Sequence, residues 1–215
     1  MSKLVWDAAG TKEYEVGVNH GVLFLYDEET HKWKGQAWQG LTNVTESPDG
    51  GDAEDFYADN ILYASIRGTE KLSGSIECFM YPDDFNDCIG HVELMPGVRV
   101  AQQARKVFAI AYETTVGNDT NTEAGKKYHL VYNATAQAAE MSHDTIEDSV
   151  DLEPMSFDFD SVPINVPGHK PTSSITIDSR TLTASQVTAL EDALYGTASE
   201  DSYLPQPDEF ATLLK

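Results

Sequence analysis

The chain has 215 residues, and 36 Asp and Glu against 14 Lys and Arg give it a formal net charge of -22. This length is enough for one sizeable domain with its own core. So large an excess of carboxylates repels phosphate, which disfavours tight, sequence-independent binding of nucleic acid through Lys and Arg. The same charge also fits two simpler interpretations, a device for solubility and an acidic protein from a high-salt habitat.

The first residues do not have the pattern of an export signal or a membrane span. Asp7, Glu13 and Glu15 stand where a signal peptide needs an apolar core, and the apolar run Val22 to Tyr26 is far too short to cross a bilayer. We therefore expect no membrane partner. Without export, Cys78 and Cys88 are expected to be free thiols rather than a disulfide.

Alternation of apolar and polar residues predicts strands along much of the chain. The alternating segments are Glu15 to Tyr26, Lys71 to Tyr81, Lys127 to Thr135, Ser156 to Asp160 and Ser174 to Asp178. In the fourth segment, Phe157 and Phe159 would face a core while Asp158 and Asp160 face water. Several half-buried antiparallel strands of this kind predict a sandwich or a barrel.

One helix is marked at both of its ends. Thr183 and Gln186 have the spacing of a capping box, and Gly196 stands where a C-terminal cap is needed. Between them, Val187, Leu190 and Leu194 share one face, which we interpret as a core-packing face. A short helical turn is expected from Pro82 to Cys88, with Pro at its first position.

Two connections are longer than a hairpin requires, namely Ser47 to Asn60 and Gly117 to Gly125. Such loops are where function or assembly residues tend to lie. Near the C-terminus, Phe210, Leu213 and Leu214 need a docking surface on the same chain or on a neighbour. We expect a single domain, 1–215, with 197–215 as a C-terminal docking segment.

No catalytic constellation can be recognised in the sequence. The motifs of serine hydrolases, of phosphate-binding loops and of zinc proteases are absent, and the six histidines have no ligand-like spacing. Asp49, Asp52, Glu54 and Asp55 could hold Ca²⁺ in a Gly-containing loop, but a solvated acidic loop is the simpler interpretation. We expect no enzyme activity, no cofactor and no metal.

Several stretches in order along the chain resemble the major tail protein (tail-tube protein) family of long-tailed, siphovirus-type bacteriophages. The most specific stretch is Trp38 to Pro48 running into Asp49-Gly50-Gly51 and Tyr57 to Asn60. The supporting stretches are Leu4 to Asp7, Tyr14 to Val22, Gly74 to Glu77, Tyr81 to Phe85, Gln103 to Arg105, Tyr112 to Asp119, Tyr128 to Ala134 and Leu204 to Glu209. One departure is Phe157-Asp158-Phe159-Asp160, where the family pattern leads us to expect an aromatic residue, often Trp, and fewer acids.

The resemblance implies two packed antiparallel sheets, a tail-tube type β-sandwich, with one flanking α-helix and long assembly loops. It implies self-association into homohexameric rings that stack into a tube, through which double-stranded DNA passes without tight binding during ejection. It also implies tape measure, tail terminator and distal tail proteins as partners, and a place in the virion tail after assembly in the host cytoplasm. Acidic residues on the lumen wall would hold the DNA off that wall.

Two sets of residues are expected to carry these roles. The lumen-facing set consists of polar positions on the strands beside the long connections: Asn43, Thr45, Glu46, Arg67, Glu70, Glu113, Thr115, His129 and Asn133. The set for contacts between subunits or rings is the acidic connection: Asp49, Gly50, Gly51, Asp52, Glu54, Asp55, Phe56 and Tyr57.

Three alternatives stay open. The first is a monomeric β-sandwich module that binds a carbohydrate or a partner through exposed aromatics such as Trp33 and Trp38. The second is a calcium-dependent or hydrolytic enzyme that uses the acidic loop. The third keeps the tube but places it in a phage-derived particle.

Overall fold

The computed structural model describes the chain except for residues 1–3, 5, 69, 144 and 146–151. The described chain is mainly antiparallel β-structure. The strands are β1 (Tyr14–Asp27), β2 (Lys32–Trp38), β3 (Leu41–Asp49), β4 (Ala53–Ala58), β5 (Ile61–Arg67), β6 (Lys71–Cys78), β7 (Val92–Met95), β8 (Val98–Val100), β9 (Phe108–Gly117), β10 (Gly125–Ala136), β11 (Met155–Ser161) and β12 (Ser174–Asp178). The helices are α1 (Phe85–Cys88), α2 (Ala184–Tyr195), α3 (Phe210–Leu213) and the 3-10 turn η1 (Ser179–Thr181).

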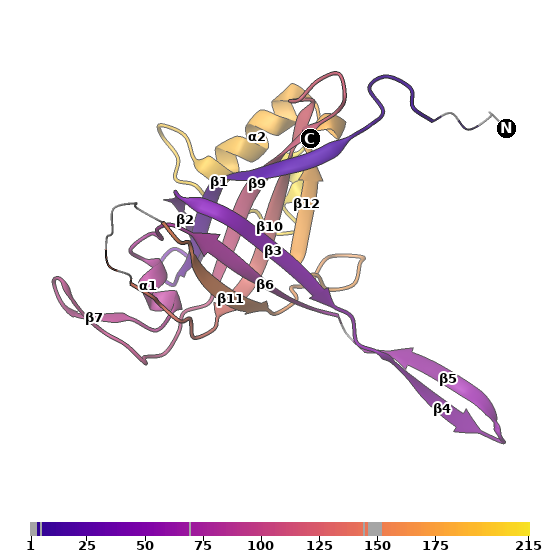
Figure 1. The fold of residues 1–215 in the computed structure, drawn as a ribbon, viewed down its shortest axis with the longest axis horizontal. Helices are drawn as coiled ribbons and strands as arrows, with labels where there is room; N and C mark the ends of the chain where they lie inside the picture. The colour runs from indigo at the N-terminus through magenta and orange to yellow at the C-terminus, as the bar shows by residue number, and fades with distance from the viewer. Residues whose placement is uncertain (1–3, 5, 69, 144, 146–151) are drawn as a thin grey trace.

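The body of the protein is a sandwich of two layers that are continuous through β10. The hydrogen-bonded order is β2-β1-β9-β10-β11-β6-β3, and β12 also pairs with β10. Lys127–Val131 of β10 pairs with β12, whereas Ala134–Ala136 pairs with β11. Between these two stretches Asn133 has a φ of 45°, and the register with β9 shifts. The chain bends there, so β11, β6 and β3 cross over β10, β9 and β1 (Figure 1).

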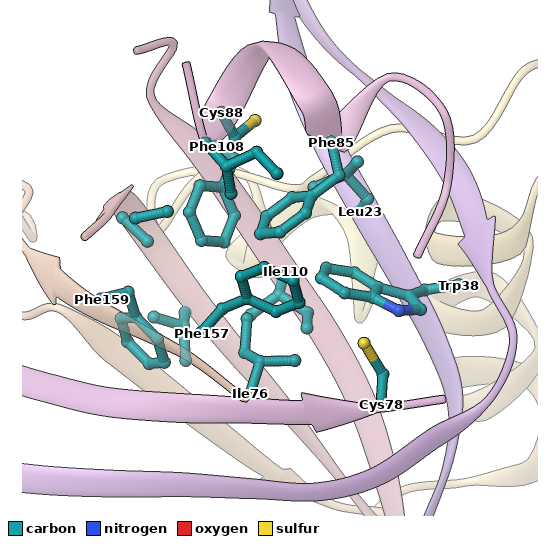
Figure 2. Close-up of a cluster of buried hydrophobic side chains, with 14 of the residues drawn as sticks. Leu23, Trp38, Ile76, Cys78, Phe85, Cys88, Phe108, Ile110, Phe157 and Phe159 are labelled. Carbon is teal, nitrogen blue, oxygen red and sulfur yellow. The ribbon is translucent and has the colours of Figure 1, made fainter. Parts of the chain in front are cut away.

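The main core lies between the two layers. Phe85 of α1 is fully buried at its centre, where its ring makes edge-to-face contacts with Phe108 and Phe157 and a tilted contact with Trp38. Figure 2 shows these rings with the aliphatic side chains of both layers around them. Because each aromatic side chain buries a large apolar area, this cluster contributes strongly to the stability of the body.

A second core lies on the other side of the β1–β9–β10 layer, under α2. Val22, Phe24, Tyr128, Leu130 and Tyr132 point toward this helix. Leu190 and Leu194 pack on them from α2. The central layer is therefore covered on both faces, and all of Phe108–Glu113 in β9 is buried.

The predicted fold class is confirmed: the protein is mainly β, with one flanking helix. The Thr183 hydroxyl accepts a hydrogen bond from the Gln186 N–H, and the Gln186 side chain accepts one from the Thr183 N–H, which completes the capping box. Gly196 ends the helix with a φ of 75°. The expected turn from Pro82 to Cys88 contains α1. None of the helices in the described ranges is long and apolar enough to span a membrane.

The alternation expected along Glu15 to Tyr26 holds only in part. Gly17 and His20 have φ values of 74° and 47°, and the pairing of β1 with β9 shifts register on both sides of Asn19. These irregularities leave Val16 exposed, whereas Gly21–Phe24 is buried on both faces. A strand with two covered faces has no polar side to alternate with.

The connection expected from Ser47 to Asn60 is not a loop. Ser47–Asp49 completes β3, and β4 pairs with β5 in a two-stranded hairpin that projects from the body (Figure 1). Asp59 and Asn60 form its turn, with φ values of 53° and 65°. Asn and Asp tolerate this left-handed region better than other residues, which suits them to a tight hairpin turn. The second long connection, after Gly117, is the turn between β9 and β10.

The C-terminal segment packs on its own chain. Leu204 is buried, and Phe210, Leu213 and Leu214 pack against the core under α2. Gln186 of α2 donates a side-chain hydrogen bond to the Leu214 carbonyl. The apolar residues near the C-terminus thus have a docking surface within the subunit.

Candidate functional site

The first candidate surface is the β4–β5 hairpin, which we call the arm (residues 52–67). Its strands contact chiefly each other. Its large apolar side chains are exposed: Phe56 43%, Tyr57 71%, Ile61 65%, Leu62 52%, Tyr63 77% and Ile66 59%. An isolated two-stranded hairpin is at best marginally stable in water, and exposed apolar patches of this kind mark interaction sites.

The arm joins the body through a narrow neck of two glycines. A Cβ atom placed on Gly51 would lie 3.0 Å from the Cα of Gly68. The two backbone segments therefore approach each other more closely than side chains would allow. Beyond the neck, Asp52, Glu54, Asp55 and Asp59 make the arm acidic, and no Lys or Arg occurs before Arg67.

The second candidate surface is the β7–β8 hairpin, which follows α1. Val92, Leu94, Met95, Val98 and Val100 are all exposed on it. Its turn contains Gly97, whose N–H donates to the Glu93 carboxylate at 3.2 Å.

Cations are concentrated in and after this second hairpin. Arg99, Arg105 and Lys106 lie within eight residues of one another in a chain with only 14 Lys and Arg. The Arg99 guanidinium lies 3.7 Å from Asp83, and the Lys106 ammonium lies 2.8 Å from Asp87 of α1. Two of the three cations are therefore paired with carboxylates in or just before α1.

The third candidate surface is the outer face of the β3–β6–β11 layer. It carries small hydroxyls and carboxylates, among them Thr45, Ser47, Ser73, Ser75 and Asp158. These residues line a shallow hollow of about 310 Å³. The facing expected for β11 is confirmed, because Phe157 and Phe159 are buried while Asp158 and Asp160 are exposed.

Gly74 shapes the floor of this hollow. A Cβ atom at this position would lie 2.1 Å from the Thr45 carbonyl and 2.6 Å from the ring of Phe159. The close approach of the Thr45 carbonyl on the neighbouring strand β3 therefore requires a residue without a side chain at position 74.

The nine residues expected to face a lumen do not share one surface. Asn43 and Thr45 are exposed on β3, and Arg67 and Glu70 lie at the arm's return to the body. Thr115 and Asn133 are half-buried on β9 and β10. The other three are held in two polar clusters.

The first polar cluster lies at one end of the sandwich, between the layers. His129 stacks on Tyr112 with their ring centroids 4.7 Å apart, and Tyr112 donates to Glu46 of β3 at 2.7 Å. On its other side, His129 lies 3.0 Å from the Glu15 carboxylate, which also accepts from Lys127 and from the Thr114 hydroxyl. Burial alone would raise the pKa of Glu15, but the hydrogen bonds from Lys127 and Thr114 and the positive charge of Lys127 lower it to about 2.

The second polar cluster surrounds Glu113, beneath α2. Glu113 is 2% exposed. Its carboxylate lies 2.6 Å from the His20 ring and 3.1 Å from the Lys126 ammonium. Tyr195 of α2 donates to the same carboxylate at 3.2 Å. Burial, and then the nearby charge of Glu113, raise the pKa of Tyr195. Glu113 is buried and faces α2, so its side chain is not exposed on the surface of the subunit.

The residues that suggested other functions do not form such sites. In the described part of the chain, no three His, Cys, Asp or Glu side chains come together as metal ligands, the acidic connection included. Trp38, expected to be an exposed aromatic in a binding module, is 3% exposed and donates its indole N–H to the Met80 carbonyl. Cys78 and Cys88 are buried free thiols.

The two outermost strands of the sheet, β2 and β3, differ in whether their outer edges are covered. The Gly35 N–H of β2 donates to the Ser202 carbonyl, and Lys34 and Tyr203 form an isolated antiparallel backbone bridge. The C-terminal segment therefore covers part of the edge of β2. For β3, no strand of the described chain pairs with its outer edge. An open edge of this length is a template for pairing with another chain.

Comparison with known proteins gives structural similarities but none in sequence. No protein-family model matches the chain, and none of the curated proteins is similar to it in sequence. Its fold is similar to that of a chain in the sheath–tube complex of PVC, an extracellular contractile injection system, in the extended state. The TM-score is 0.41 and the identity 14%, over 74% of this chain and 88% of that chain.

Sequence reasoning missed the β7–β8 hairpin as a surface. The segment Val92 to Val100 does contain a signal for it, because apolar residues flank the dipeptide Pro96-Gly97, a common turn pair. The Glu113 cluster could not be found in this way, since Tyr195 and His20 are far from Glu113 in the sequence.

Proposed function

We propose that this chain is a non-enzymatic structural subunit of a tail tube of the kind found in siphovirus-type phages. Copies assemble into homohexameric rings, and the rings stack into a tube through which double-stranded DNA is ejected. The ring number, the phage type and the passage of DNA rest on the sequence resemblance described above. The same resemblance supports tape measure, tail terminator and distal tail proteins as partners, and assembly in the host cytoplasm before incorporation into the virion.

The observation that carries the proposal is the unpartnered arm. Within the described chain, a projecting hairpin with six large exposed apolar side chains contacts chiefly itself. A second surface, the open edge of β3, is equally suited to a neighbouring chain. Both features would lower the solubility and stability of a monomer, but they are expected in a protein that polymerises.

Electron microscopy of the concentrated protein, with an arm deletion beside it, tests this function. Deleting residues 52–67 joins Gly51 to Gly68, whose backbones already lie in contact, so the body is expected to fold unchanged. The intact chain should form rings or hollow tubes in negative stain, while the deletion variant stays a folded monomer. A monodisperse monomer of the intact chain at high concentration would contradict the proposal.

We further propose that the outer face of the β3–β6–β11 layer lines the tube. Most of its exposed residues are hydroxyls, amides and carboxylates, with Asn43 and Thr45 on β3 and Asp158 and Asp160 on β11, while Lys71 of β6 is a cation on the same face. A wall on which carboxylates outnumber cations repels DNA phosphate. In assembled particles, Asp158→Lys with Asp160→Lys should leave the tubes intact and slow DNA ejection. Unchanged ejection from intact tubes would rule out this role.

A monomeric binding module is the second candidate. The burial of Trp38 removes one of the two tryptophans on which a carbohydrate site would have depended. Affinity of a stable monomer for glycans would favour the module over the tube.

A further inference from the structure

The arm and the β7–β8 hairpin are complementary in charge. The arm has four carboxylates, Asp52, Glu54, Asp55 and Asp59, and no cation before Arg67. The stretch from His91 to Val107, which contains the β7–β8 hairpin, has three cations and one acid, Glu93. Arg99 and Lys106 already pair with Asp83 and Asp87 of the same subunit, so Arg105 is the cation of this stretch that has no ion pair within the described chain. Complementary charges guide two surfaces to each other and fix their register.

The two hairpins also expose different apolar side chains that can pack against each other. Phe56, Tyr57 and Tyr63 supply exposed aromatic rings on the arm. Leu94 and Met95 supply exposed aliphatic side chains near the turn of the β7–β8 hairpin. Aromatic anchors that fill an aliphatic surface, with charges around them, are the usual composition of an interface centre and rim.

The hairpins cannot meet within one subunit. Along the longest axis of the molecule, the arm projects at one end and the β7–β8 hairpin lies at the other (Figure 1). A contact between two different patches at opposite ends joins copies head to tail, and such a contact produces a ring or an open filament.

We propose that the arm of one copy docks on the β7–β8 hairpin of a second copy. The proposal rests on the proposed function, because it names the surface that receives the arm when the chain assembles. The aromatic side chains of the arm lie against Leu94 and Met95, and its carboxylates face Arg99 and Arg105. Docking covers both exposed apolar hairpins at once.

Crosslinking with single cysteines tests which surfaces meet. Cys78 and Cys88 are fully buried, so an introduced surface cysteine is the reactive thiol. One preparation has Tyr57→Cys on the arm, and another has Leu94→Cys on the β7–β8 hairpin. They are mixed under assembly conditions and treated with a short bismaleimide. Ser199→Cys, in the exposed segment after α2, replaces Leu94→Cys in the control mixture.

The proposal predicts crosslinked dimers in the Tyr57→Cys and Leu94→Cys mixture, and their loss in the control mixture. Dimers from Tyr57→Cys alone, with none added by Leu94→Cys, would mean that arms pair with arms and would overturn the proposal. Tubes in the microscope without a crosslink in the mixture would overturn the docking surface and leave the proposed function standing. Absence of both oligomers and crosslinks would overturn the docking surface and the proposed function together.

A charge exchange tests the same contact without cysteines. Glu54→Lys with Asp55→Lys on the arm should abolish assembly, and so should Arg99→Glu with Arg105→Glu on the other hairpin. Combining all four substitutions should restore it, since the attraction is then reversed in sign at both surfaces. Normal assembly of both partial variants would overturn the proposal.

Discussion

Glu113 of β9 and Lys126 of β10 form an ion pair beneath α2, with 3.1 Å between the carboxylate oxygen and the ammonium nitrogen. Burial by itself would lower the pKa of Lys126, but its hydrogen bond with Glu113 and the carboxylate charge raise it. Tyr195 from α2 donates to the same carboxylate. The Tyr195 hydrogen bond to buried Glu113, and a contact of 3.6 Å between Lys126 and Glu191 of α2, thus join the helix to the sheet.

Removing the carboxylate should loosen this attachment. We expect Glu113→Ala to lower the free energy of unfolding by about 2–3 kcal/mol, because bonds to charged groups contribute about 1.5–3 kcal/mol and the Tyr195 hydroxyl loses its acceptor. Glu113→Gln, which keeps an acceptor, should lose less. Urea unfolding at neutral pH measures the change, with Glu123→Ala in the exposed β9–β10 turn as the control. An equal effect of the two alanine substitutions would contradict the role assigned to Glu113.

Gly74 should not tolerate any side chain. In Gly74→Ala the new methyl group would lie 2.1 Å from the Thr45 carbonyl, so β3 must move away from β6. Overpacking of this kind costs about 1–3 kcal/mol, or more where backbone has to shift. Gly50→Ala is a matched control, since its nearest contact would be an ordinary 3.7 Å. Thermal unfolding that shows the same midpoint for both variants would disprove the steric argument.

Glu15 should make stability depend on pH in acid. Because its pKa falls from 4.5 to about 2 on folding, the folded state favours the ionised carboxylate. Its contribution is therefore fully present above about pH 4.5 and is lost as the pH falls toward 2. The difference in unfolding free energy between the intact chain and Glu15→Gln should shrink over this range, and that between the intact chain and Glu123→Gln should not. A difference independent of pH between 5 and 2 would refute this prediction.

The two cysteines should be inert while the protein is folded. Burial raises the pKa of Cys78 to about 11 and that of Cys88 to about 12, which leaves almost no thiolate at pH 8. A disulfide reagent such as Ellman's should react with neither thiol in buffer and with both in denaturant. Rapid reaction of one thiol in the native protein would show that its side of the core opens readily.

Sequence patterns were sufficient where one face of an element meets water. The alternation in β6 and β11 and the capped stripe of α2 predicted these elements and their buried sides. They failed for β9, since a strand covered on both faces shows no alternation. They also failed for β4, where acidic and glycine residues indicated a loop, although Phe56 and Tyr57 lie in a strand. Neither the Glu113 cluster nor the opposite positions of the two hairpins can be read from spacing, because both depend on how distant segments cross.

The neck formed by Gly51 and Gly68 has a mechanical consequence. A contact made at the end of an arm transmits pull along the arm, but two bare backbone segments offer little resistance to tilting. Subunits joined through such necks would keep their contacts while rocking against one another. A polymer built in this way would be strong in tension and compliant in bending, and its curvature would be absorbed between the bodies rather than within their cores.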